Sequence, residues 1–218
     1  MEKFTDRGQA GRFLAHQLNA YAHHSDAIVL ALPRGGVPVA FEIAVHLALA
    51  LDVFVVRKLG VPYHKELAMG AIASGDIVLL DEKLIHQLKL KKTEVNATIA
   101  EEKKELARRE TLYHSRTVPL LKGKEVLLVD DGIATGFTMK AAITAIRKQK
   151  PAKIIVAAPV AALDTYEKLV PLVDDIICPL TPLHFQAVGL WYDNFSQTSD
   201  EEVCALLRKN MLVNHRAD

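Results

Sequence analysis

The sequence has few of the features that mark disulfide-rich, zinc-binding or membrane proteins. Its 218 residues include two cysteines, Cys178 and Cys204, which do not form a CxxC pair. We therefore expect no disulfide scaffold and no zinc site, and the composition fits a reducing compartment. The chain has no run of about 18 apolar residues, which argues against a membrane span. The opening segment MEKFTDRGQAGRF has no apolar signal region, so a cytoplasmic protein is expected.

An excess of charge of one sign is also missing. The chain has 27 Lys and Arg against 26 Asp and Glu, a formal net charge of +1 and a pI of about 7.8. Because no domain-wide basic surplus exists, we expect no nucleic-acid partner. The hydrophobic share of 50% is enough for a substantial core. The length favours one domain with an appendage over two equal domains.

Short apolar runs alternate with glycine turns and helical patterns along most of the chain. This alternation is typical of a parallel α/β sheet whose strands are buried on both faces. A hairpin of 68–74 with 76–80 interrupts it, around Ser74 and Gly75. We expect the other strands at 28–32, 51–56, 125–131, 153–161 and 174–180, and helices at 6–23, 36–50, 138–149 and 163–173.

Residues 82–115 differ from the rest of the chain because they are highly charged and lack glycine and proline. Glutamate and lysine recur there at helical spacing, which supports a solvated helix. The segment is therefore interpreted as a charged helical insertion, either a surface helix or a dimer arm. Acidic residues interleave the basic ones, so a nucleic-acid role is poorly supported.

The stretch VLLVDDGIATGFT, residues 126–138, carries the strongest chemical signal. Its apolar strand delivers Asp130 and Asp131 to the carboxyl edge of the sheet, where ligands bind in open α/β folds. The Gly and Thr loop then leads into a helix N-terminus, which suits a phosphate. The aspartates suit hydroxyl donors or a hydrated cation. A sugar phosphate offers both groups, whereas the P-loop and GxGxxG patterns are absent.

The stretch closely resembles the phosphoribosyl-diphosphate-binding motif of type I phosphoribosyltransferases. That motif is a short apolar strand, two acidic residues, and a small-residue loop with Thr-Gly and a final Thr or Ser. The resemblance implies a single domain over 1–218 with a three-layer, parallel-sheet α/β core at about 25–180. A hood at about 181–218, with the N-terminal helix, and the insertion at about 82–115 would complete it.

The resemblance also implies roles for the motif residues. Asp130 and Asp131 would hold the ribose 2- and 3-hydroxyls. Magnesium would bridge the diphosphate and ribose oxygens, held mainly by the substrate with the two aspartates nearby. The 5-phosphate would be cradled by Ile133, Ala134, Thr135, Gly136, Phe137 and Thr138.

Two further segments are expected to serve the diphosphate. The loop of Arg34, Gly35 and Gly36 ends the first core strand, where backbone N–H groups and a guanidinium could bind it. Arg57 and Lys58 are placed at the end of the next strand, where they would neutralise the leaving diphosphate. Each could instead be an ordinary strand-end turn or a solvated pair. His64 and Lys65 lie where type I enzymes carry a mobile loop, and are candidate diphosphate contacts or plain surface residues.

The acceptor site is expected in the hood. Phe185, Trp191 and Tyr192, with Phe195, could stack on a base, or could equally close a hydrophobic lid or dimer contact. Ala134 stands where hypoxanthine-guanine enzymes place an aspartate and adenine enzymes an alanine. Asp193 could serve in place of that aspartate, and Phe137 is bulkier than the small residue expected between Gly136 and Thr138.

Three functions compete. The first is a magnesium-dependent phosphoribosyltransferase, a homodimer by family analogy, that transfers phosphoribosyl to a nucleobase-like acceptor in nucleotide salvage. The second is a homologue that binds phosphoribosyl diphosphate as a regulatory ligand without catalysis. The third is a phosphate-ester hydrolase that uses Asp130 as nucleophile or metal ligand. The sequence shows no appended partner-binding domain or basic recognition helix, which favours the enzyme.

Overall fold

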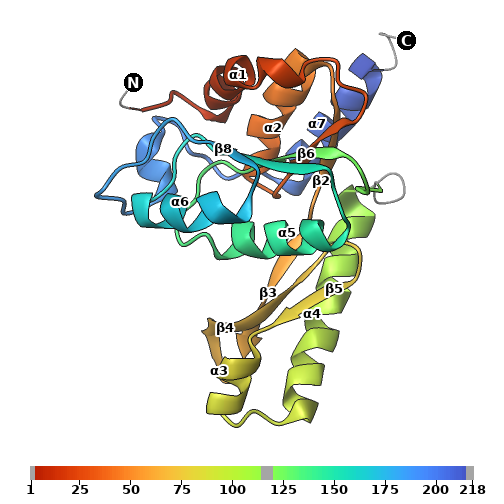
Figure 1. Ribbon diagram of the computed structural model, residues 1–218, viewed down its shortest axis with the longest axis vertical. Coiled ribbons are helices and arrows are strands. Elements are labelled where there is room, and N and C mark those ends of the chain that lie inside the picture. The colour runs from red at the N-terminus through yellow and green to blue at the C-terminus, as the bar shows by residue number, and fades with distance from the viewer. Residues whose placement is uncertain (1–2, 114–119, 215–218) are drawn as a thin grey trace.

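A five-stranded parallel sheet forms the centre of the protein, seen in a computed structural model that describes residues 3–113 and 120–214 (Figure 1). Its strand order is β2-β1-β6-β7-β8, and all neighbouring strands are parallel. The predicted α/β class is confirmed. The strands are β1 (Ala27–Ala31), β2 (Ala50–Val53), β6 (Glu125–Val129), β7 (Lys153–Ala157) and β8 (Asp175–Ile177).

Helices cover both faces of this sheet, as Figure 1 shows. Successive residues of β1, β6 and β7 contribute to opposite apolar clusters, because side chains alternate along a strand. One cluster contains the apolar faces of α1 (Arg7–Gln17), α2 (Gly36–Leu47) and α7 (Asp200–Asn214). The other contains those of α5 (Phe137–Lys148) and α6 (Leu163–Leu169). Short 3₁₀ helices are η1 (Asn19–Tyr21), η2 (Val170–Leu172) and η3 (Val188–Trp191).

An arm projects from this core (Figure 1). Its antiparallel sheet consists of β3 (Val56–Val61), β4 (His64–Ala73) and β5 (Ile77–Leu80), and the predicted hairpin is confirmed in β4 and β5. The predicted strand at 51–56 is wrong in extent, because β2 ends at Val53 and a new strand starts at Val56. Ser74 causes the change: its Oγ accepts from Val55 N at 3.0 Å, and its N–H donates to Val55 O at 2.9 Å.

The charged insertion completes the arm as two helices, α3 (Glu82–Gln87) and α4 (Lys92–Tyr113), rather than one. The helix is interrupted between α3 and α4. The Glu94 carboxylate accepts a hydrogen bond from Lys91 N at 2.9 Å, which caps the start of the second helix. Residues 114 and 115 of the predicted insertion lie outside the described residues. None of the helices in the described part of the chain combines the length and apolarity needed to cross a membrane.

The pairing of β1 with β6 places two loops side by side at the carboxyl edge of the sheet. Ala31 is in register with Val129, and Leu32 N donates to Val129 O at 2.9 Å. The chain then runs outward on either side, from β1 to β2 and from β6 to β7. The loops after β1 and β6 therefore border the crevice at the topological switch point, the usual ligand site in such sheets.

Segments near both ends of the described chain meet above this edge. Phe4 N donates to Trp191 O at 3.0 Å, and Asp193 N donates to Phe4 O at 2.9 Å. A hood thus forms from the residues around Phe4 and from 188–196. Helix α7, which lay within the predicted hood, instead packs on α2 and β2 because Val203 and Leu207 join their apolar cluster.

One buried side chain fastens α7 to the edge of the sheet. Asn210 is 1% exposed; its Oδ1 accepts from Leu51 N at 3.0 Å and its Nδ2 donates to Leu49 O at 3.3 Å. The amide therefore satisfies backbone groups on the outer side of β2 that have no neighbouring strand.

Asn210→Ala should lower the free energy of unfolding by about 2 kcal/mol, because it leaves a buried N–H without a partner and a small cavity. For a chain of this size that corresponds to a fall in Tm of about 4–8 °C. Thermal denaturation against Asn96→Ala, an exposed position on α4, provides the measurement and its control. Equal Tm values for the two variants would contradict the role of the amide.

Candidate functional site

Two adjacent carboxylates follow β6 at the sheet edge. Asp131 N donates to Asp130 Oδ1 at 2.8 Å, which fixes the first side chain against the turn. Burial raises the pKa of Asp130 well above its usual range, and the negative charge of Asp131 raises it further. Burial also raises the pKa of Asp131, although the guanidinium of Arg7 opposes it. The pair therefore favours an arriving group that donates hydrogen bonds or carries positive charge.

The loop after Asp131 is held by hydrogen bonds to the segment that follows β7 and to α6. Ile133 N donates to Val160 O, and Ala162 N donates to Ile133 O, each at 2.9 Å. The Ile133 side chain is 2% exposed in the core, so the prediction of a substrate contact can concern only its backbone. Thr165 Oγ1 donates to Ala134 O at 2.7 Å. These bonds shape the loop before any ligand binds.

The rest of the loop opens toward a cavity at the start of α5. Gly136 has φ 69° at the N-cap, and a Cβ there would lie 2.5 Å from Thr165 Cγ2, so glycine is required. Thr135 and Thr138 are exposed. The cavity, about 200 Å³, is lined by residues 132–139 with Asp130 and Val188. A helix N-terminus with nearby hydroxyls is the environment that a phosphate prefers.

The loop after β1 packs directly on the acidic pair. Its Pro33–Arg34 peptide is cis. A Cβ at Gly35 would lie 2.0 Å from Asp131 Oδ2, and one at Gly36 would lie 2.7 Å from Val129 O. Only glycine permits this approach, so the two loops border one crevice as predicted.

The Arg34 side chain lies toward the start of α7. Its Nη1 lies 3.7 Å from Asp200 Oδ1, and the same oxygen accepts from Tyr113 Oη at 2.5 Å. The guanidinium is 35% exposed and the separation exceeds that of a hydrogen bond, so the pair is weak. Its predicted role toward diphosphate stays a prediction.

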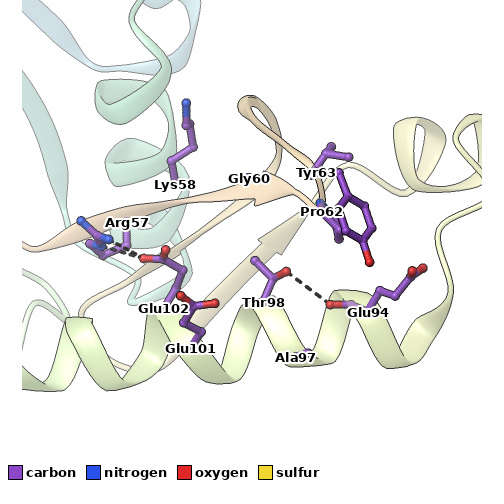
Figure 2. Close-up of a pocket in the computed structure, with 11 residues that line it drawn as sticks. Arg57, Lys58, Gly60, Pro62, Tyr63, Glu94, Ala97, Thr98, Glu101 and Glu102 are labelled. Carbon is purple, nitrogen blue, oxygen red and sulfur yellow. Dashed lines mark hydrogen bonds and ion pairs between the residues drawn. The ribbon is translucent and has the colours of Figure 1, made fainter.

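The structure separates Arg57 and Lys58. Both lie inside β3 of the arm instead of at the end of a strand of the parallel sheet. Figure 2 shows Arg57 paired with Glu102 of α4, with Nη2 2.6 Å from Oε2, and Lys58 pointing away from that helix. Arg57 and Lys58 point to opposite faces of β3 because successive side chains along a strand alternate between the two faces. Lys58 lines a cavity of about 1010 Å³ together with Thr135, Gly136 and Phe137, so it is one of three cations there, with Lys140 and Lys168.

The predicted mobile loop forms the β3–β4 hairpin. Tyr63 stands at its tip with φ 67° and 94% exposure, and His64 is exposed beside it. The side chain of Lys65 lies outside the described part of the structure. Closure of this hairpin over a ligand stays a prediction.

Of the two roles left open for the hood aromatics, a stacking surface for a base or a hydrophobic lid, the packing of Tyr192 fits the lid. Tyr192 is 4% exposed, its ring stacks on Phe195 with centroids 5.1 Å apart, and Phe4 lies at 6.0 Å. Its Oη donates to Asp131 O at 2.6 Å, so it supports the acidic turn and has no open face for a base. Trp191 packs against the same aromatic cluster. Phe185 is half-buried, and its acceptor role stays a prediction.

One residue of the site escaped the sequence analysis. Arg7, the first residue of α1, donates from Nε to Asp131 Oδ2 at 2.8 Å, and its Nη2 lies 2.8 Å from the same oxygen. The residues around Arg7 indicate only where a helix begins. The Asp6 side chain accepts a hydrogen bond from Gln9 N and caps α1, which starts at Arg7. No local pattern indicates a partner at a separation of 124 residues.

Comparison with known proteins fits this geometry. A family model described as the phosphoribosyl transferase domain matches residues 64–189. Proteins named "Putative phosphoribosyl transferase" in two strains of Mycobacterium tuberculosis are 44% identical over 95% of this chain. The chain belongs to the phosphoribosyl transferase family.

The fold of this family member also matches a solved structure. The crystal structure of TT1426 from Thermus thermophilus is 36% identical, with a TM-score of 0.83, and the match covers 95% of this chain and 98% of that one. The chain spans about half the length, 47%, of the curated Mycobacterium relatives it matches. The family span includes the acidic pair and the phosphate loop, whereas Arg7 and the loop after β1 lie before it.

Asp130→Asn should raise the Tm of the ligand-free protein at pH 8. The folded-state pKa of Asp130 is raised above the unfolded value of about 3.9, so ionisation destabilises the folded protein as pH rises through that window. The gain should therefore shrink as pH falls toward the unfolded pKa. Each unit of raised pKa corresponds to about 1.4 kcal/mol.

Thermal unfolding from pH 5 to pH 8 with a metal chelator measures this effect. The exposed Asp26, replaced by Asn, serves as the matched control, and its Tm difference from the wild type should stay constant. A destabilised Asp130→Asn protein at pH 8 would show that the carboxylate is not a source of strain.

Proposed function

We propose that the protein is a magnesium-dependent phosphoribosyltransferase that moves phosphoribosyl from phosphoribosyl diphosphate to a nucleobase-like acceptor. The observation that carries the proposal is the crevice at the switch point. There a destabilised carboxylate pair, a phosphate-shaped loop and a glycine loop with close backbone approach share one edge. A sugar carrying hydroxyls, a phosphate and a diphosphate matches these three elements in turn.

Each element would hold one part of the donor. Asp130 and Asp131 would accept hydrogen bonds from the ribose hydroxyls, which relieves the cost of two buried negative charges. The backbone N–H groups at the start of α5, with the Thr135 and Thr138 hydroxyls, would bind the 5-phosphate. Gly35 and Gly36 would offer backbone N–H groups to the diphosphate.

The reaction would break the bond between ribose C1 and the diphosphate oxygen and form a bond from C1 to an acceptor nitrogen. Diphosphate leaves with the electron pair, and the acceptor loses its proton to the solvent. Negative charge grows on the leaving group, so a cation placed there lowers the barrier. Lys58 lines the cavity that Thr135, Gly136 and Phe137 border, as do Lys140 and Lys168, and would serve that task from β3.

The donor set suits magnesium held mainly by the substrate. In residues 3–113 and 120–214, no group of three or more His, Cys, Asp or Glu side chains is arranged to hold a metal ion. Magnesium commonly uses one or two carboxylates together with substrate oxygens, and the buried aspartate pair gains from a nearby cation. Asp130 and Asp131 would border the ion, which would offset the negative charge of the diphosphate and of the two carboxylates.

The acceptor site would lie between the acidic turn and the hood. Val188 contacts the turn so closely that a Cβ at Gly132 would lie 2.4 Å from Val188 Cγ1. Ala134 brings no carboxylate to the position that contacts oxo-purines in related enzymes.

The alternative function is a regulatory protein that binds phosphoribosyl diphosphate without catalysis. It would form the same complex with the donor but show no turnover, so a screen of acceptors for turnover separates the two functions.

Phosphoribosyl diphosphate with magnesium should raise the Tm, since a ligand that binds only the folded state stabilises it. At a hundredfold excess over Kd the gain is about 2.7 kcal/mol. Differential scanning fluorimetry measures the shift, and Asp131→Asn should reduce it strongly. No shift of the wild type at millimolar ligand would overturn the proposed function.

Lys58→Ala should weaken binding of phosphoribosyl diphosphate more than Arg57→Ala does, because Lys58, unlike Arg57, lines the cavity of about 1010 Å³ bordered by Thr135, Gly136 and Phe137. We expect about a tenfold rise in Kd for Lys58→Ala, in line with one charge-assisted contact. Arg57→Ala should instead lower the Tm, since it leaves the part-buried Glu102 without its partner. Titration calorimetry gives both Kd values, and the reverse order would move the diphosphate to the α4 side of β3.

A further inference from the structure

All three guanidinium nitrogens of Arg7 contact other groups of the protein. Nε donates to Asp131 Oδ2 at 2.8 Å, Nη2 lies 2.8 Å from the same oxygen, and Nη1 donates to Ser196 O at 2.7 Å. The plane also lies over the Phe195 ring, with Cζ 3.9 Å from the centroid. The Arg7 side chain is 11% exposed and that of Asp131 13%, so the charged contact between them is largely shielded from water, whereas the contact with Ser196 O lies at the surface.

The contacts leave little freedom to the Asp131 carboxylate. Both arginine nitrogens converge on Oδ2, and Gly35 closes the space on another side of that oxygen. The backbone beneath is held by the Tyr192 hydroxyl, which donates to Asp131 O at 2.6 Å. With Oδ2 held by Arg7 and the Asp130 side chain hydrogen-bonded to the same carboxylate, the orientation of the Asp131 side chain is fixed within the site.

The same side chain joins three segments that are far apart in sequence. It starts on α1, reaches the turn after β6 through Asp131, and grips the hood through Phe195 and Ser196. The other arginine in the first half of α1, Arg12, pairs with Glu42 at the surface and is 58% exposed. The two residues therefore share a helix but differ in surroundings.

We propose that Arg7 is a positioning residue of the ribose site, which holds the Asp131 carboxylate in position for a donor hydroxyl and couples that carboxylate to the hood. The inference rests on the proposed function, because it assigns Asp131 to the ribose. It concerns a residue outside the span matched by the family. Arg7 touches Asp131 rather than the donor, so its effect is indirect.

If Arg7 blocked the Asp131 carboxylate instead of positioning it, the change in donor affinity on removal of Arg7 would have the opposite sign. If the guanidinium merely occupied Asp131 and had to leave before the ribose could bind, removal of Arg7 would tighten binding of the donor. If it positions the carboxylate, removal weakens that binding. A charge-assisted contact of this kind corresponds to a change of about tenfold to a hundredfold in Kd.

The experiment compares wild type, Arg7→Met, Arg7→Lys and Arg12→Met by titration calorimetry with two ligands. The ligands are phosphoribosyl diphosphate and inorganic diphosphate, each with magnesium. Only the first carries ribose hydroxyls, so a positioning role acts on it alone. Amide hydrogen exchange over residues 130–138 is measured on the same four proteins without ligand.

We expect Arg7→Met to raise the Kd of phosphoribosyl diphosphate about tenfold to a hundredfold and to leave that of diphosphate unchanged. Arg7→Lys, which keeps the charge but loses the fork, should fall between Arg7→Met and wild type. Arg12→Met should match wild type. Unchanged or tighter donor binding in Arg7→Met, or equal weakening of both ligands, would overturn the proposal.

Absence of donor binding by wild type would reject the proposed function and, with it, the ribose assignment of Asp131 on which this inference rests. The exchange data separate that failure from a failure of Arg7 alone. Faster exchange over 130–138 in Arg7→Met than in Arg12→Met shows that Arg7 holds the acidic turn. Equal exchange in the two variants counts against positioning whichever ligand binds.

Discussion

The pairing of β1 with β6 is the constraint on which the rest of the site depends. Because Ala31 stands in register with Val129, the chain must leave both strands at one point of the sheet edge. The glycine loop and the acidic turn then have to share the same small space, which only Gly35 and Gly36 allow. The carboxylates are thereby buried beside each other, and their chemistry follows from a backbone register.

Without a ligand, the burial of two ionised carboxylates lowers the stability of the folded protein. Burial works against the charges of Asp130 and Asp131, and the guanidinium of Arg7 on α1 opposes that effect, while the Tyr192 hydroxyl of the hood holds the Asp131 backbone carbonyl. Functional sites commonly hold such local strain, which the binding partner relieves. The hood therefore supports the site indirectly, through the Asp131 backbone and through its contacts with Arg7.

Local patterns in the sequence were enough to predict the parallel sheet, the hairpin and the loop after β6. Continuous apolar runs and glycine turns carry that information within a few residues. Three features depend on distant contacts and were missed or misplaced: the jump from β2 to β3 at Ser74, the opposite facing of Arg57 and Lys58, and the Arg7 pair with Asp131. The burial of Tyr192 also depends on neighbours from the far end of the chain.

The meeting of residues 4–7 with 191–196 has a consequence for the order in which the chain is made. The ribosome releases the acidic turn well before Tyr192 and Phe195 exist, so the buried carboxylates first lack part of their support. Tyr192 follows Asp131 by 61 residues in the sequence. A nascent chain would therefore carry the acidic turn before the hood that supports it, and the synthesis of residues 191–196 completes that support.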